Sequence, residues 1–273
     1  MDERLESILH SYRESQGNLT VLTGAGISKE SGIPTFRGKE GYWTVGSKEY
    51  QPVEMATVRM FNRDPFEVWK WYLYRKTICT NASLNAGHLA VAQLEWIFKD
   101  RFCLITQNVD GLHIRAGNSL EKTYQIHGNI DFMRCFKRCT MDIFPIPEEI
   151  PPKGKGDVLT EKDRVLLACP YCGSLSRPHV LWFDESYNEI YYRFESSIQR
   201  ALQTDLLIVI GTSGATNLPM QVGSLVARRN ATMIDINPAK NPFSHMAEST
   251  ERGYYYPGKS SEILPCIVDF LKQ

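Results

Sequence analysis

The chain has 273 residues, a hydrophobic content of 42% and a formal net charge of zero, from 31 Lys and Arg against 31 Asp and Glu. This length corresponds to two domains, or to one large α/β domain with an insertion. The balanced charge argues against direct binding of nucleic acid or of an anionic membrane surface, and the composition argues against a disordered chain.

Several features of the sequence bear on the compartment. The longest strongly apolar run, Leu206–Ile210, has five residues, far fewer than the 18 or more that a membrane span needs. The start of the chain, Met-Asp-Glu-Arg, resembles neither a signal peptide nor a transit peptide. Four of the seven cysteines form two tight pairs, which favours a reducing compartment and a metal site over disulfides. We therefore expect a cytoplasmic protein, and an organelle matrix stays open.

Apolar residues spaced three and four apart predict a helix near the start of the chain, around Leu5 and Tyr12. The further predicted elements, in chain order, are a strand at Leu19–Thr23, helices at Asp64–Thr80 and Gly87–Phe98, strands at Phe102–Thr106, Thr123–Ile126, Leu206–Ile210 and Thr232–Asn237, and a helix at Ser261–Leu271. Strands that alternate with helices predict an α/β fold with a Rossmann-like, doubly wound parallel sheet. Ligands of such sheets bind at the carboxyl ends of the strands.

Two segments interrupt this alternation. Residues 131–184 hold the paired cysteines and the Pro- and Gly-rich stretch Pro145–Gly156, which predicts a small inserted zinc-binding module. Residues from about 38 to 87 are rich in Trp and Tyr and predict a helical insertion. The predicted large domain therefore comprises residues 1–130 and 185–273, and the predicted small module comprises residues 131–184.

The first motif, Gly24-Ala25-Gly26-Ile27-Ser28, directly follows a predicted strand. Glycines at such a place let backbone N–H groups approach a pyrophosphate at a helix N-terminus. A dinucleotide fingerprint would have glycine where Lys29 stands, so a plain strand-to-helix turn remains an alternative. The loop that follows contains Phe36 and Arg37 between glycines and could close over a cofactor.

Two further motifs follow predicted strands. Gln107, Asn108 and Asp110 lie just past one strand end, where this architecture places ligands, although a loop capped by its own side chains would look the same. His127 follows the next strand and precedes Gly128, which suits a general base near neutral pH. A lone histidine is more often structural, and we interpret the other five histidines in that way.

The two cysteine pairs predict a metal site. Cys135 and Cys139 are separated by three residues, and Cys169 and Cys172 by two. Each pair can place two thiolates on one tetrahedral Zn²⁺, and ligation by cysteines alone predicts a structural ion. Buried free thiols are the alternative for these four residues. The remaining cysteines, which we expect to be ordinary buried residues, are Cys79, Cys103 and Cys266.

In combination and in this order, the motifs resemble those of the sirtuins, the NAD-dependent protein lysine deacylases. The resemblance extends from about Leu19 to Leu264 and rests on GAGIS, SGIPTFRG, TQNVDGLH, the His-Gly pair and the cysteine pairs. It implies NAD as cofactor, one structural Zn²⁺, and acylated lysine in a protein or peptide as substrate. In the family chemistry the acyl oxygen attacks the ribose as nicotinamide leaves, and a histidine then helps a ribose hydroxyl attack. The products are free lysine, nicotinamide and acylated ADP-ribose.

The resemblance also implies roles for individual residues. His127 would be the general base. The cofactor would be held by Gly24, Ala25, Gly26, Ser28, Phe36, Arg37, Gln107, Asn108, Asp110, Gly211, Thr212, Ser213, Asn237 and Ser260. Val180, Leu181 and Phe183 would contact the substrate peptide.

One helix motif resembles the sirtuin branch that removes succinyl, malonyl and glutaryl groups. Tyr72 and Arg75 match the Tyr-x-x-Arg of that branch, and Ala56 stands where the branch widens its acyl pocket with a small residue. Residues three apart share one helix face, so both side chains can reach one carboxylate. The alternative is core packing by the aromatic residue and a solvated charge on the arginine.

The chain also departs from the family pattern, since Asp184 stands where the family usually has glycine. A side chain there could alter peptide docking.

Two other functions stay open. One is an ordinary NAD-dependent deacetylase, in which Tyr72 and Arg75 are structural. The other is an NAD hydrolase or NAD sensor without a lysine substrate, and Asp184 is its sequence support. The protein targets and the oligomeric state are not predicted.

Overall fold

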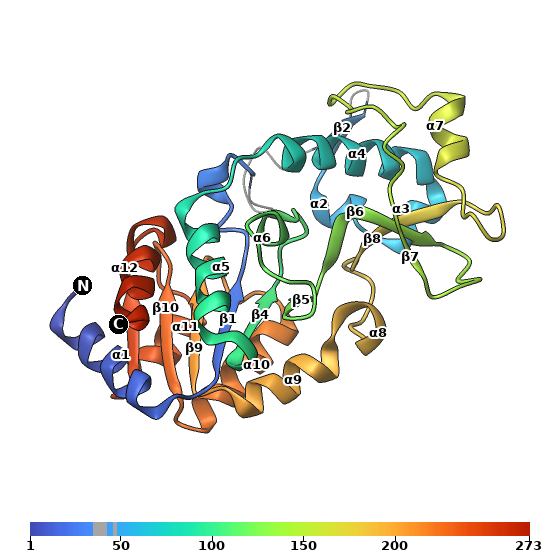
Figure 1. Cartoon of the computed structure of the whole chain (residues 1–273). Helices are drawn as coiled ribbons and strands as arrows, with labels where there is room; N and C mark the ends of the chain where they lie inside the picture. Colours follow the sequence, from blue (N-terminus) through green and yellow to red (C-terminus); the bar gives the residue numbers. More distant parts are fainter. Residues whose placement is uncertain (35–42, 46–47) are drawn as a thin grey trace.

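A computed structural model describes residues 1–34, 43–45 and 48–273, with a six-stranded parallel sheet at one end (Figure 1). The strand order is β11-β10-β9-β1-β4-β5. These strands are β1 (Leu19–Thr23), β4 (Phe102–Thr106), β5 (Thr123–Gln125), β9 (Leu206–Ile210), β10 (Thr232–Ile236) and β11 (Gly253–Tyr256). β1 pairs with β4 on one side and with β9 on the other. The chain first builds the sheet from β1 toward β4 and β5 and later adds β9 on the opposite side of β1, so the strand order reverses at β1.

Helices cover both faces of this sheet. α1 (Glu3–Ser15), α5 (Ala86–Phe98) and α12 (Ser260–Lys272) pack on one face, and α9 (Phe194–Gln203), α10 (Asn217–Arg228) and α11 (Pro242–Glu248) pack on the other. Successive strand residues point to opposite faces, so Ile208 joins the first core and Leu207 the second. Burial on both faces explains why β9 is a continuous apolar run.

The expected Rossmann-like fold is confirmed, and β1, β4 and β9 have the predicted bounds. Several helix and strand ends are shifted by one residue, and β10 ends at Ile236 instead of Asn237. The fifth core strand along the chain is followed by a further edge strand, β11, which was not predicted. The strand predicted to end at Ile126 ends at Gln125. Cys266 is exposed on α12, so the expectation that it is buried is wrong, whereas Cys79 and Cys103 are buried.

A second body carries the four paired cysteines at the other end of the molecule (Figure 1). It contains an antiparallel sheet in the order β7-β6-β8, formed by β6 (Gly128–Cys135), β7 (Ile143–Pro145) and β8 (Ser176–Val180), with the short helix α7 (Glu161–Leu166). Three helices pack against this sheet, namely α2 (Pro52–Met55), α3 (Val58–Arg63) and α4 (Pro65–Asn81).

One hydrophobic core joins these helices to the cysteine-containing segment. It includes Trp69 and Trp71 from α4, Met133 from β6 and Trp182 just after β8. The indole N–H of Trp69 also donates to the carbonyl of Ser176, at 2.9 Å. The two segments that interrupt the strand–helix alternation in the sequence therefore share one core.

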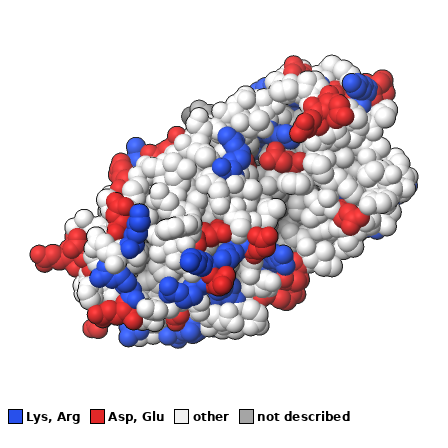
Figure 2. All heavy atoms as spheres, viewed as in Figure 1, with Lys and Arg blue, Asp and Glu red and all other residues white. Residues whose placement is uncertain are grey.

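The remaining described elements are short. They are η1 (Lys29–Ser31), β2 (Trp43–Val45) antiparallel to β3 (Lys48–Tyr50), η3 (Lys99–Arg101), α6 (Leu112–Arg115) and α8 (Glu189–Tyr192). Figure 2 shows acidic and basic side chains next to one another on the visible face, with large uncharged areas between them. Within the described ranges, no helix combines the length and the apolar content that crossing a membrane requires.

Candidate active site

The carboxyl ends of the parallel strands bring the predicted cofactor loops together. Thr23 at the end of β1 is in register with Thr106 of β4 and with Ile210 of β9, and Gln125 of β5 is in register with Thr106. The loops that follow these strands therefore leave the sheet at one edge. This edge is also where the strand order reverses, which is the usual ligand position in such sheets.

The glycines after β1 allow two loops to pack backbone against backbone. The N–H of Gly24 donates to the carbonyl of Ile210, and the N–H of Gly26 donates to the carbonyl of Gly211. A Cβ on Gly26 would lie 2.6 Å from Cα of Gly211, and Gly211 has a φ of +61°. The N–H groups of Gly24 and Gly26 therefore donate to the chain's own carbonyls, and pyrophosphate binding by other N–H groups of this loop stays a prediction. The loop also leads into the short turn η1 rather than into a long helix.

Ser28, Asn108 and Asp110 form one buried polar group. The Ser28 hydroxyl donates to the Asp110 carboxylate at 2.7 Å, and the Asn108 amide donates to the Ser28 oxygen at 3.1 Å. Burial raises the pKa of the Asp110 carboxyl, while its hydrogen bond from Ser28 opposes that shift. An amide and a carboxyl side by side can recognise a carboxamide, which offers both a donor and an acceptor.

Gln107 connects the loops that follow β4 and β9. Its side-chain N–H donates to the Thr212 hydroxyl, and its side-chain oxygen accepts from the Thr216 hydroxyl, both at 2.9 Å. The first contact brings together two predicted cofactor residues. Ser213, the next predicted residue, is exposed at the same loop.

The predicted base, His127, lies between this loop and the second body. Its Nδ1 is 2.9 Å from the carbonyl oxygen of Gln107, and its Nε2 is 2.8 Å from the hydroxyl of Tyr187. A carbonyl can only accept, so we assign the proton to Nδ1 and the lone pair to Nε2. Burial lowers the pKa of His127 to about 4, so the imidazole is neutral near pH 7 and can accept a proton.

The remaining predicted cofactor residues also lie at this edge. Asn237 follows β10, is buried, and donates its side-chain N–H to Asp235. Burial raises the pKa of Asp235 to about 7. Ser260 begins α12, and a Cβ on Gly87 would lie 3.0 Å from its hydroxyl and 3.3 Å from Ile27. Phe36 and Arg37 lie outside the described residues.

The predicted peptide-binding segment runs directly beside the base. The N–H of Leu181 donates to the carbonyl of His127 at 2.9 Å, and Val180 pairs with Gly128 in the small sheet. The N–H of Phe183 donates to the carbonyl of Ala56 at 3.0 Å, and the Phe183 side chain is exposed. The predicted substrate residues and the predicted acyl-pocket residue Ala56 are therefore held together.

Asp184 has a structural role that the sequence does not indicate. Its carboxylate accepts from the first backbone N–H groups of α3, those of Val58 at 2.8 Å and Arg59 at 3.2 Å. A carboxylate at a helix N-terminus satisfies donors that have no partner within the helix. The charge that departs from the family pattern thus ties the predicted peptide-binding segment to α3.

The predicted acyl-pocket residues Tyr72 and Arg75 are buried on α4, and the residues are 3% and 7% exposed. The hydroxyl of Tyr72 accepts from the indole N–H of Trp182 at 3.0 Å, and the guanidinium of Arg75 lies 5.3 Å from the ring centre of Trp71. Burial lowers the pKa of Arg75, whereas the nearby Tyr72 and Asp110 raise it. Arg75 thus lies within electrostatic reach of both Tyr72 and Asp110.

The four paired cysteines meet as predicted. Their Sγ atoms all lie within 4.8 Å of one another, and the Cys135–Cys172 and Cys139–Cys169 pairs are each 3.6 Å apart. A tetrahedral ZnS₄ centre with bonds of about 2.3 Å has sulfur–sulfur distances of about 3.8 Å. The four thiolates therefore fit one structural Zn²⁺, as expected from the spacing.

Removal of one of these thiols should release the metal and destabilise the fold. We expect Cys169→Ala to contain close to no zinc and to lose on the order of 10 °C in Tm, because metal binding contributes directly to folding. Metal analysis of the purified protein and thermal unfolding measure both effects. The control is Cys266→Ala, which removes an exposed thiol outside the cluster. Full zinc content in Cys169→Ala would contradict the assignment.

Comparison with known proteins places this arrangement in a family. The sequence pattern of the Sir2 family matches residues 24–217. The chain belongs to the Sir2 family. It is 38% identical over 267 residues to the NAD-dependent protein deacylase of Leptospira interrogans serogroup Icterohaemorrhagiae serovar Lai, with 97% of each chain covered. It is 37% identical over 275 residues to NAD-dependent protein deacylase 1 of Archaeoglobus fulgidus, with 100% of this chain and 99% of that protein covered.

Solved structures agree with this membership. The crystal structure of a Sir2 homolog–NAD complex superposes with a TM-score of 0.78 at 33% identity, and covers 100% of this chain and 94% of that chain. The sequence resemblance to the sirtuins is thereby confirmed for this Sir2 chain. The two relatives are named NAD-dependent protein deacylases, which is the expected enzyme class. NAD, the expected cofactor, is the ligand in the Sir2 homolog complex.

Two residues of the site were not predicted in this Sir2 chain. Tyr187 contacts the base, and Thr216 contacts Gln107. Neither lies in a recognised motif, and only their polar character near predicted site residues could have drawn attention to them.

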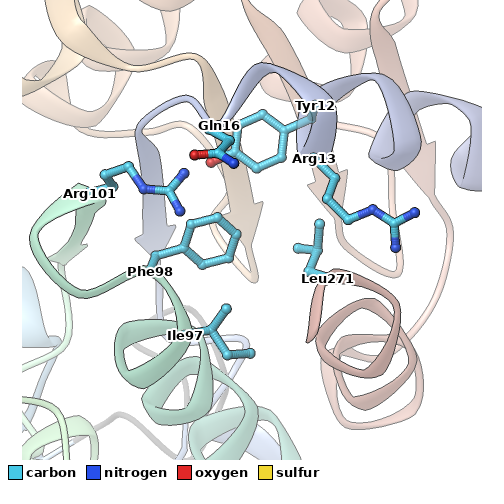
Figure 3. Close-up of a pocket in the computed structure, with 7 residues that line it drawn as sticks. All are labelled: Tyr12, Arg13, Gln16, Ile97, Phe98, Arg101 and Leu271. Atoms are coloured by element: carbon cyan, nitrogen blue, oxygen red, sulfur yellow. The ribbon is translucent and has the colours of Figure 1, made fainter. Parts of the chain in front are cut away.

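A cavity of about 160 Å³ lies elsewhere in the molecule, among α1, α5 and α12 (Figure 3). Its lining includes Arg13 and Arg101, which flank the rings of Tyr12 and Phe98 in the close-up. Each arginine already donates to a backbone carbonyl. No predicted site residue lines this cavity, so it is separate from the candidate active site.

Proposed function

We propose that this Sir2-family chain is an NAD-dependent protein-lysine deacylase that prefers acyl groups ending in a carboxylate, such as succinyl, malonyl and glutaryl groups. The activity in its general form is the one named for its relatives from Leptospira and Archaeoglobus. The preference for acidic acyl groups rests on this chain's own residues, above all on Tyr72 and Arg75.

Each group of residues has a role in the proposed reaction. NAD supplies an electrophilic ribose carbon, a leaving nicotinamide and hydroxyls that receive the acyl group. Asn108 and Asp110 would hold the carboxamide, since they pair an amide with a buried carboxyl. His127 would take a proton from a ribose hydroxyl at Nε2, because Nδ1 is engaged by the carbonyl of Gln107.

The observation that carries the acyl preference is a buried guanidinium beside a buried phenol on one face of α4. Tyr72 contacts Trp182, which directly precedes the predicted peptide residue Phe183. Arg75 follows one helical turn later and is almost fully buried. A guanidinium fork pairs with a carboxylate through two parallel hydrogen bonds, and a phenol adds a third donor. A lysine acyl chain that enters beside Trp182 would present its terminal carboxylate to these groups.

Burial makes this recognition selective. Moving a carboxylate out of water costs free energy, which is offset only where a well-oriented cation receives it. An acetyl group carries no charge and gains nothing from the guanidinium. The buried Arg75 therefore favours acidic acyl groups over neutral groups of smaller size.

An ordinary deacetylase is the second candidate, and two contacts favour it. The Tyr72 hydroxyl already accepts from Trp182, and the Arg75 guanidinium already lies over the ring of Trp71. Both side chains would then be structural. The NAD hydrolase or NAD sensor has less support, because Asp184, its sequence argument, has a structural role as a cap of α3.

A direct comparison of two peptides tests the proposal. We expect kcat/KM for a succinyl-lysine peptide to exceed that for the acetyl-lysine peptide of the same sequence by at least about tenfold, since one charge-assisted hydrogen bond is worth about 1.5–3 kcal/mol. Nicotinamide release and mass spectrometry of the peptide measure both rates. An acetyl rate equal to or above the succinyl rate would support the ordinary deacetylase. Nicotinamide release that needs neither peptide would support the hydrolase.

A further inference from the structure

The atom of His127 that must accept a proton is already occupied in the protein. Nδ1 is engaged by the carbonyl of Gln107, so only Nε2 can act as the base. The hydroxyl of Tyr187 lies 2.8 Å from that nitrogen. Burial raises the pKa of Tyr187 to about 12, so the phenol keeps its proton near pH 7 and donates it to the Nε2 lone pair.

Packing fixes the phenol at this position. The ring of Tyr187 stacks on the imidazole with the centres 5.9 Å apart, and it stacks on Phe194 with the centres 6.3 Å apart. The hydroxyl of the neighbouring Thr216 donates to the side-chain oxygen of Gln107 at 2.9 Å. Ring packing and the contact with Nε2 thus hold the phenol beside the base.

We infer that Tyr187 is a positioning residue of the ribose site, whose phenol holds the place at Nε2 of His127 that a ribose hydroxyl takes when NAD binds. A phenol and a ribose hydroxyl offer the same group to the imidazole, one O–H donor. Nε2 has a single lone pair, so the two hydroxyls cannot both donate to it. Thr216 gives the displaced phenol a second partner, which lowers the cost of the exchange. This inference rests on the proposed use of NAD by the chain.

Competition for one nitrogen makes a specific prediction about binding. In Tyr187→Phe the ring and its stacking remain, and only the competing O–H is lost. We expect NAD, without any peptide, to bind this variant about threefold to fivefold more tightly than the wild type, the size of one ordinary hydrogen bond. Isothermal titration calorimetry on the full-length protein measures the Kd.

A second background separates competition at His127 from other effects of the substitution. In His127→Ala there is no imidazole to compete for, so Tyr187→Phe should leave the Kd for NAD unchanged. Tyr191→Phe is the matched control, because Tyr191 is close in sequence and its hydroxyl contacts Met141 instead of the base. It should leave the Kd unchanged in both backgrounds.

Each outcome decides the inference. Tighter binding in the wild-type background alone supports it. An unchanged Kd, weaker binding, or an equal change in both backgrounds overturns it, since Tyr187 would then be an ordinary wall of the pocket. Wild-type protein that does not bind NAD at all would refute the proposed function as well, so the two failures are distinguishable.

Discussion

Replacing Arg75 by methionine should remove most activity on succinyl-lysine and leave activity on acetyl-lysine. We expect kcat/KM for the succinyl peptide to fall about 30-fold to 1,000-fold, which corresponds to about 2–4 kcal/mol for a buried carboxylate that loses its cation. Methionine keeps much of the length and apolar contact of the arginine stem. The acetyl peptide carries no carboxylate, so its kcat/KM should change less than about threefold. Steady-state rates on both peptides measure the two effects.

Two further variants on α4 test whether the effect is specific to a guanidinium in the pocket. Lys76→Met removes the neighbouring cation, which pairs with Asp131 at 3.5 Å, and should affect both peptides equally and weakly. Arg75→Lys keeps the charge but loses the fork, and should recover only part of the succinyl activity. Equal losses on both peptides in Arg75→Met would show that the arginine is structural and would contradict the acidic-pocket proposal.

Replacing His127 by alanine should nearly abolish deacylation while NAD still binds. Loss of a general base costs about 10²-fold to 10⁴-fold in rate. Folding should persist, because the carbonyl of His127 still accepts from Leu181 in the variant. Peptide deacylation, circular dichroism and calorimetry with NAD measure the three properties.

His245→Ala is the control for this substitution, since His245 is exposed on α11 and far along the chain from the strand-end motifs. It should retain wild-type rates on both peptides. Turnover near the wild-type rate in His127→Ala would remove His127 from the mechanism. Loss of NAD binding together with loss of activity would mean that the imidazole contributes to the pocket rather than to proton transfer.

The central strands could be predicted to the residue because they are buried on both faces. Leu206–Ile210 has no polar residue at all, and it ends where Gly211 takes a positive φ. The edge strand β11 could not be predicted in the same way. It has the sequence Gly-Tyr-Tyr-Tyr, its tyrosines are only half-buried, and it pairs with one neighbour. Without two buried faces, a short aromatic run does not distinguish a strand from a loop.

In the candidate site, too, residues placed by the local sequence could be predicted, whereas contacts between distant segments could not. Residues that directly follow strands, such as Asn108 and His127, were predictable because a parallel sheet places all such ends at one edge. Their partners were not, because the contacts of Tyr187 with His127 and of Asp184 with α3 join segments that are 60 or more residues apart. The close packing of the glycines near Gly24 on Gly211 could not be predicted either, because the two loops are far apart in the sequence.

The shared core of α2–α4 and the small sheet has a consequence for redesign of this enzyme. Tyr72 and Arg75 stand on α4, whose apolar face is completed by Met133 and Trp182, residues on either side of the cysteine pairs. Ala56 lies between α2 and α3 and belongs to the same core. The predicted acyl-pocket residues and the cysteine-containing segment therefore belong to one packing unit, although β4 and β5 lie between them in the sequence. A chimera that transfers acyl selectivity to another scaffold has to carry both segments, because either one alone would expose the tryptophans that the other covers.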